Sequence, residues 1–156
     1  MKKKYFLDDL DFDEEINLLA IHSNLEGYQL AFEINQATGA RFKRSKKDID
    51  LPQLKAFYTR FTWIDPKTDQ HFDLFTNSYK KVSSNKKGKK ITLFEQAPVK
   101  KVYLLQQYNN VNYFIKTNHL EQLSLLKNKL KKLNSISMLY VLPSSKINNP
   151  QNLIFD

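Results

Sequence analysis

The segment between residues 16 and 39 constrains the fold of this 156-residue chain more than any other part of the sequence. Residues 16–22 form an apolar run of strand length. Ser23 and Glu26 follow with the spacing of a capping box, in which each side chain hydrogen-bonds to the backbone N–H of the other residue. Apolar residues then recur at helical spacing, and Gly39 stands where a left-handed C-terminal cap belongs. The sequence therefore predicts a strand followed by a helix that ends near residue 38.

The remaining elements are further strands and a second helix. Strands are predicted at residues 4–7, 41–43, 56–64, 70–79, 91–94, 102–105, 111–116 and 138–142, and the helix at 120–133, where leucines lie along one side. The order strand, helix, strands, then strand, helix, strand indicates an α+β domain in which two helices cover one face of a largely antiparallel sheet. It also fits a ferredoxin-like split βαβ fold with a β-hairpin inserted between its halves. Because the chain shows no internal repeat and no long linker, residues 1–156 are expected to form a single domain.

Basic residues outnumber acidic ones, and the excess is unevenly distributed. The formal net charge is +9, with eight carboxylates and no basic residue from Asp8 to Glu33, and with 22 basic against 8 acidic residues from Arg41 onward. Such a positive field favours polyanions, namely nucleic acid, an anionic membrane surface or an acidic protein. The alternative is that the excess only keeps the protein soluble, because 22 of the 25 basic residues are lysines and lysine is the usual surface cation.

Several kinds of chemistry are disfavoured by what the chain lacks. Without cysteine there are no disulfides, thiolate nucleophiles or cysteine-ligated metals, and three glycines are too few for the usual phosphate-binding loops. His22, His71 and His119 lack the spacing of a zinc motif. We therefore expect no metal, no cofactor and no enzymatic activity. No stretch reaches the ~20 apolar residues that span a bilayer, and the basic N-terminus lacks the apolar region of a signal peptide, so a cytoplasmic protein is expected.

Basic residues interleaved with aromatic ones form the first candidate site. Proteins that bind single-stranded nucleic acids stack bases on aromatic rings beside cations that contact phosphates. Residues 41–44 and 58–61 show this interleaving, with Tyr58 and Arg60 predicted on the outer face of their strand, and residues 80–90 form a lysine-rich segment that is either a mobile loop or a binding arm. The predicted face would contact RNA or another polyanion with low sequence specificity, because lysines contact phosphates and not bases. It comprises Arg41, Lys43, Arg44, Tyr58, Arg60, Lys80, Lys81, Lys86, Lys87, Lys89 and Lys90.

An adaptor that docks on a protein partner is the alternative function. Its apolar patch would combine Leu125, which falls off the leucine side of the second helix, with the tail residues Leu153, Ile154 and Phe155. The tail is also expected to dock on the core, because three bulky apolar side chains are costly to expose to water. Charge would then set only the rate of encounter with the partner. The sequence leaves the oligomeric state open.

Residues 105–113, with the sequence LQQYNNVNY, resemble the motif that names the IPExxxVDY family, small bacterial proteins of the Bacteroidetes group with no assigned activity. Val111 and Tyr113 agree with the motif, whereas Gln107 and Asn112 stand where it has carboxylates. Residues 18–23, 25–31, 41–44 and 152–156 are also similar to this family, so that the resemblance covers nearly the whole chain. Because an amide neither titrates nor ligates metals strongly, the two replacements favour a structural role for the motif.

Overall fold

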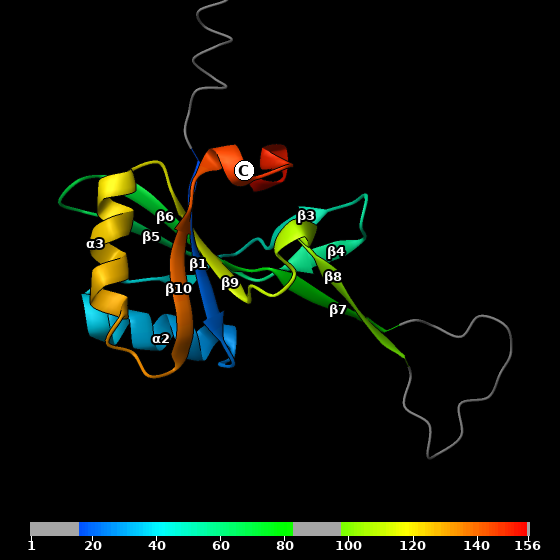
Figure 1. Ribbon diagram of the computed structural model, residues 1–156, viewed down its shortest axis with the longest axis horizontal. Coiled ribbons are helices and arrows are strands. Elements are labelled where there is room, and N and C mark those ends of the chain that lie inside the picture. Colours follow the sequence, from blue (N-terminus) through cyan, green and yellow to red (C-terminus); the bar gives the residue numbers. More distant parts are fainter. Residues whose placement is uncertain (1–15, 83–97, 156) are drawn as a thin grey trace, which may run out of the picture.

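The computed structural model describes residues 16–82 and 98–155, and it confirms the predicted α+β class (Figure 1). Its strands are β1 (Asn17–Ser23), β2 (Lys43–Arg44), β3 (Ile49–Leu51), β4 (Ala56–Tyr58), β5 (Arg60–Asp65), β6 (Gln70–Thr76), β7 (Ser78–Val82), β8 (Val99–Tyr103), β9 (Tyr113–Thr117) and β10 (Ile136–Leu142). Its α-helices are α2 (Gly27–Thr38) and α3 (Leu120–Leu130). Short 3-10 helices span Gln106–Tyr108, Ser144–Lys146 and Pro150–Leu153. The strands predicted at 4–7 and 91–94, and Lys86, Lys87, Lys89 and Lys90, lie outside the described residues.

Within the described residues, a six-stranded antiparallel sheet has the order β10-β1-β9-β6-β5-β2. The four strands β10, β1, β9 and β6 have the order and directions of a split βαβ fold, with α2 following β1 and α3 connecting β9 to β10. The ribbon of β7 and β8 is inserted between β6 and β9, and therefore between the two halves, where it extends away from the helices (Figure 1). A second ribbon, β3 with β4, precedes β5.

Both helices pack on one face of the sheet, as predicted. Leu30 of α2 and Leu123 and Leu130 of α3 are fully buried in one cluster with Ile115 of β9. The leucines of α3 meet the sheet because residues three and four positions apart share a helix face. Gly39 ends α2 with φ +78°, and its N–H donates to the carbonyl of residue 35 at 3.0 Å. The predicted left-handed cap is therefore confirmed.

The opposite face of the sheet is also covered, by parts of the chain that are not helical. Phe75 and Phe114 of the sheet are buried with Tyr58 of β4, Leu104 of the loop after β8, and Leu153 of the tail. The sheet therefore has an apolar layer on each side. Strand β1 is buried at nearly every position, which explains why its sequence is a continuous apolar run and does not alternate.

Helix α2 begins later than the spacing of Ser23 and Glu26 predicts. Glu26 is the N-cap: its side chain accepts a hydrogen bond from the backbone N–H of Gln29, and Gln29 Oε1 accepts from the N–H of Glu26 at 3.1 Å. Ser23 Oγ instead accepts from the N–H of Leu25 at 3.2 Å in the preceding turn. The capping box is thus displaced by three residues, because Ser23 is still the last residue of β1.

The strand predicted at residues 56–64 is two strands that belong to different sheets. β4 pairs with β3, whereas β5 pairs with β6 and β2, and Thr59 separates them. The side-chain alternation is interrupted at this break. Tyr58 is fully buried and Phe57 is 50% exposed, so the prediction that Tyr58 faces outward beside Arg60 is wrong.

Candidate functional site

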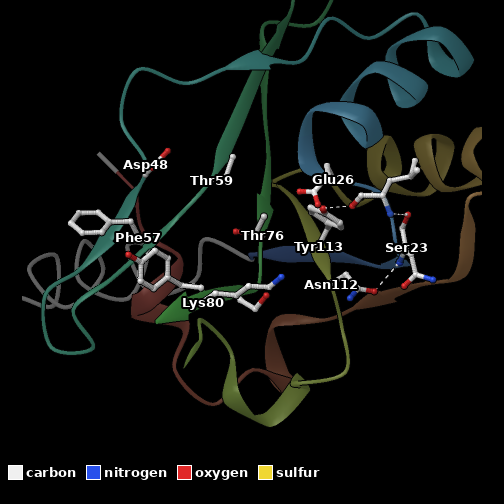
Figure 2. A pocket seen from close by; sticks show the side chains of 13 residues that line it. Ser23, Glu26, Asp48, Phe57, Thr59, Thr76, Lys80, Asn112 and Tyr113 are labelled. Carbon is white, nitrogen blue, oxygen red and sulfur yellow. Dashed lines mark hydrogen bonds between the residues drawn. The ribbon is translucent and has the colours of Figure 1, made fainter. Parts of the chain in front are cut away.

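A polar cleft of about 490 Å³ opens where the start of α2, strand β4 and the start of β7 meet (Figure 2). Phe57 and Lys80 lie on one side of it, Glu26 and Tyr113 lie on the other, and Thr76 lies between them. This volume falls within the range of small-ligand sites. The cleft is the candidate functional site, and its two walls are described in turn.

The wall on the helix side is held by hydrogen bonds. The N–H of Ser23 donates to Asn112 Oδ1 at 2.8 Å, and the Tyr113 hydroxyl donates to the carbonyl of Leu25. Burial, together with the nearby Glu26 carboxylate, raises the pKa of Tyr113 to about 12. Tyr113 is therefore a neutral hydrogen-bond donor at physiological pH and fixes the turn that leads into α2.

The opposite wall presents aromatic rings. Phe57 meets Tyr79 edge to face, with ring centroids 6.2 Å apart, and Tyr79 in turn meets Tyr58 at 6.5 Å. Tyr58 is anchored, because its hydroxyl donates to the carbonyl of Val102 at 3.2 Å. Burial raises its pKa to about 12. The rings of this wall at the cleft are thus Phe57 and Tyr79. Phe57 was missed because residues 56–64 were predicted as one unbroken strand, and Tyr79 was not singled out within the strand predicted at 70–79.

Lysines stand directly opposite each other in the β7–β8 ribbon. Lys80 pairs with Lys101 and Lys81 with Lys100 in the antiparallel register. Lys80 lines the cleft, and Lys100 and Lys101 are exposed. Lys81 differs, because its Nζ donates to the carbonyl of Leu54 at 2.6 Å. Like charges at directly opposed positions destabilise an antiparallel pair, so the opposed lysines lower the stability of this ribbon.

A second group of cations borders the cleft at Phe57. Arg44, Lys46 and Lys47 line a neighbouring hollow of about 360 Å³, which shares Asp48 and Phe57 with the cleft. Asp48 forms an ion pair with Arg44. Arg44 and Lys80 thus line two hollows that share Asp48 and Phe57.

Other members of the predicted face are not at the cleft. Arg41 and Lys43 are exposed but line neither hollow. Arg60, predicted to point outward, is largely buried: its Nε donates to Asp73 Oδ1 at 3.0 Å, and its guanidinium lies 4.9 Å from the ring centroid of Phe155. The tail covers this arginine, because the face of the sheet that was expected to be open is the site of the second apolar layer. Arg60 is therefore not part of an exposed basic face.

The residues of the predicted apolar patch lie on opposite faces of the sheet. Leu125 is exposed on α3, which packs on the helix face, whereas Leu153 is fully buried in the cluster of the other face. Phe155 is partly buried and meets Phe75 at 5.1 Å, which leaves Ile154 as the exposed residue of the tail. The tail docks on the core as predicted. The prediction that these four residues form one patch is wrong.

The motif-like segment at residues 105–113 is built around Asn77. This buried side chain donates to the carbonyls of Tyr108 at 2.8 Å and Val111 at 3.0 Å, and it accepts from the N–H of Leu105 at 2.9 Å. The backbone of Asn77 adds two more bonds, to residues 104 and 112. One amide therefore determines the path of the loop that leads to the helix-side wall of the cleft.

Two further amides of this segment, Gln107 and Asn112, also bond to backbone groups. Gln107 donates to the carbonyl of Lys146 at 3.0 Å and accepts from the N–H of Asn148 at 2.6 Å. Asn112 accepts from Ser23, as described above. These contacts fit the structural role that the sequence analysis assigned to the motif.

The described residues contain no side-chain group that could hold a metal ion and no helix that could span a membrane. No three histidine, aspartate or glutamate side chains in this part of the chain are grouped so that they could hold an ion. His22 Nε2 lies 3.1 Å from the Tyr140 hydroxyl, and burial lowers the pKa of His22. Neither helix among the described residues is long and apolar enough to cross a bilayer. The chain matches no protein-family model, and comparisons with curated proteins and with solved structures found no match.

Proposed function

We propose that this protein binds single-stranded RNA, without catalysis, through the β7–β8 ribbon and the aromatic wall of the cleft. The single observation that carries the proposal is the placement of opposed lysine pairs beside the half-exposed ring of Phe57, which meets Tyr79 edge to face. A flexible strand of nucleic acid can follow a cationic ribbon with its phosphates and stack its bases on such rings.

Phosphate binding would relieve the electrostatic repulsion between paired lysines of the ribbon. Lys80 and Lys101 repel each other in the free protein, and a phosphate group between them would replace that repulsion with two attractions. The exposed cations Lys46 and Lys47 extend the positive surface past Phe57. Because these residues contact phosphates, binding would depend little on sequence.

The acidic residues that line the cleft keep their charge, so phosphates are expected at the ribbon and not inside the cleft. Glu26 is engaged in the capping box of α2, and Asp48 is paired with Arg44. Lys80 and Lys101 have no such partner among the described residues. We place this role in the cytoplasm and retain membership of the IPExxxVDY family as a prediction.

The test measures how RNA affinity depends on salt. Binding of a labelled single-stranded RNA decamer is followed by fluorescence anisotropy over a range of NaCl concentrations. Each phosphate contact contributes roughly −0.7 to the slope of log K against log salt for a single strand. Because Lys80 and Lys101 are proposed to share one phosphate, the double variant K80Q/K101Q should lower the magnitude of the slope by about 0.7 and weaken binding at low salt.

The matched control removes the same charge elsewhere. Lys129 and Lys132 are exposed at the end of α3, outside the cleft and the ribbon. K129Q/K132Q should leave the slope close to that of the wild type. Equal effects of the two double variants would show that only net charge matters, and an affinity that does not respond to salt would refute the proposal.

A further inference from the structure

The floor of the cleft holds hydroxyl groups that make no hydrogen bond within the described residues. Thr59 and Thr76 lie side by side at the junction of the sheet and the ribbons, where the N–H of Thr76 donates to the carbonyl of Thr59 at 3.1 Å. Their Oγ1 atoms, and Oγ of Ser78, have no protein partner in that part of the chain. Figure 2 shows Thr59 and Thr76 between Phe57 and Tyr113.

The charged residues that line the cleft determine which part of a nucleotide can bind at its floor. A phosphate would approach the carboxylates of Glu26 and Asp48, which both line the cleft. Lys80 is the one cation among the described residues that line it, and it belongs to the ribbon. A neutral group with hydrogen-bonding atoms meets no such repulsion and can use the free hydroxyls, each of which both donates and accepts.

We propose that the cleft binds one unstacked nucleobase of the RNA strand, with its face against Phe57 and its edge hydrogen-bonded to Thr59 and Thr76. This inference rests on the proposed function and adds a base-reading site to it. The volume of about 490 Å³ accommodates a base with its sugar. Phe57 is half exposed and meets Tyr79 edge to face, so the ring is positioned before the base arrives.

The first test compares two oligomers of equal charge on the wild-type protein. One is an adenosine RNA decamer, and the other is a ribose-phosphate decamer in which every base is replaced by hydrogen. Stacking of a base on an aromatic side chain changes affinity by roughly tenfold or more. The wild type should therefore bind the adenosine decamer at least about tenfold more tightly at the same salt concentration, and F57A should remove most of this preference.

The second test addresses the hydroxyls with variants that keep side-chain shape. T59V/T76V should reduce the differences in affinity between the four homopolymeric RNA decamers, while leaving affinity for the base-free decamer unchanged. Thr68, exposed in the turn between β5 and β6, provides the control T68V, which should behave as the wild type. The Thr59 and Thr76 hydroxyls make no hydrogen bond within the described residues, so valine removes none. The T59V/T76V variant is therefore expected to fold.

The outcomes separate this inference from the proposed function. If the two oligomers bind equally, and K80Q/K101Q still lowers the salt slope, the base-reading site is refuted and the RNA-binding function stands. If neither oligomer binds, both proposals are refuted. A T59V/T76V variant that keeps the wild-type order of homopolymer affinities would refute the role of the hydroxyls.

Discussion

Asn77 shows how one buried amide can position a functional wall. Its side chain makes three hydrogen bonds to the backbone of residues 105–111, and its own carbonyl accepts from the N–H of Leu104 at 2.8 Å. The loop that it holds continues directly into Asn112 and Tyr113 at the cleft. The sequence carries no pattern that marks this residue, because every partner is a backbone group that lies far along the chain.

Replacing Asn77 with aspartate should be strongly destabilising. The change keeps the shape, but it removes two donated hydrogen bonds and places a carboxylate against two carbonyl groups in a fully buried site. We expect N77D to lower the free energy of unfolding by about 3 kcal/mol, measured by urea denaturation. The same change at the exposed Asn110 is the control and should cost less than about 0.5 kcal/mol. A loss of that smaller size at Asn77 would contradict the role assigned to it.

The two buried tyrosines should make stability fall in alkaline solution. Burial raises the pKa of Tyr58 and of Tyr113 to about 12, whereas an unfolded tyrosine has a pKa near 10. Between these values the folded state binds more protons than the unfolded state, so the free energy of unfolding decreases as pH rises. This contribution is complete below pH 10, and each tyrosine then lowers stability by at most about 1.4 kcal/mol per pH unit.

Tyrosine-to-phenylalanine variants test this assignment. Urea denaturation at pH 8 and at higher pH should show a flatter pH dependence for Y58F and for Y113F than for the wild type. Y28F changes an exposed tyrosine and should keep the wild-type dependence. If all three variants lose stability with pH in parallel to the wild type, the two buried hydroxyls are not responsible.

Phe57 and Tyr58 show why the sequence misplaced part of the site. Period-two alternation assigns residues to two faces of one strand, but it does not reveal which sheet a strand joins. The change of sheet at Thr59 arises because β4 pairs back with β3, whereas β5 pairs with β6, and alternation alone carries no information on pairing partners. Because of this break, Tyr58 is buried and Phe57 is exposed, whereas an unbroken strand predicted Tyr58 on the outer face.

At the scale of elements, the helices were the most predictable parts of the chain. Their apolar spacing and the cap at Gly39 are local properties, and α2 and α3 end within three residues of the predicted positions. The start of α2 was displaced because Ser23 belongs to β1, where its N–H bonds to Asn112. Tertiary pairing thus overrode a local capping signal in favour of an equivalent one three residues later.

The cap at Gly39 gives a test at this scale. Its φ of +78° is unfavourable for residues with a Cβ atom, although among the described residues no heavy atom beyond its two chain neighbours lies within 4 Å of the position that this Cβ would occupy. G39A should therefore lower the free energy of unfolding by about 1 kcal/mol through backbone strain alone, and G39N by less, because asparagine tolerates this conformation better. Thermal denaturation measures both variants. Equal stability of G39A and the wild type would contradict the assigned conformation.

For the whole molecule, the order of elements in the sequence predicted the split βαβ arrangement and the packing of both helices on one face of the sheet. It did not predict the second apolar layer on the opposite face. That layer is assembled from β3 and β4, the loop after β8 and the tail, which are separated along the chain. Each contributes only a few apolar residues, and these have no common periodicity. The consequence for the site is direct, because this layer buries Tyr58 and covers Arg60, and so leaves the β7–β8 ribbon and Phe57 as the surface for which RNA binding is proposed.

The tail provides the test of this two-layer organisation, because neighbouring residues there have opposite environments. Leu153 is fully buried, whereas Ile154 is 71% exposed. L153A should lower the free energy of unfolding by about 3 kcal/mol, because it removes buried methyl groups and leaves a cavity, and I154A should change it by less than about 0.5 kcal/mol. Urea denaturation of the two variants measures the difference. If I154A costs as much as L153A, the tail does not pack as described, and the face of the sheet that carries Arg60 would be open to a polyanion after all.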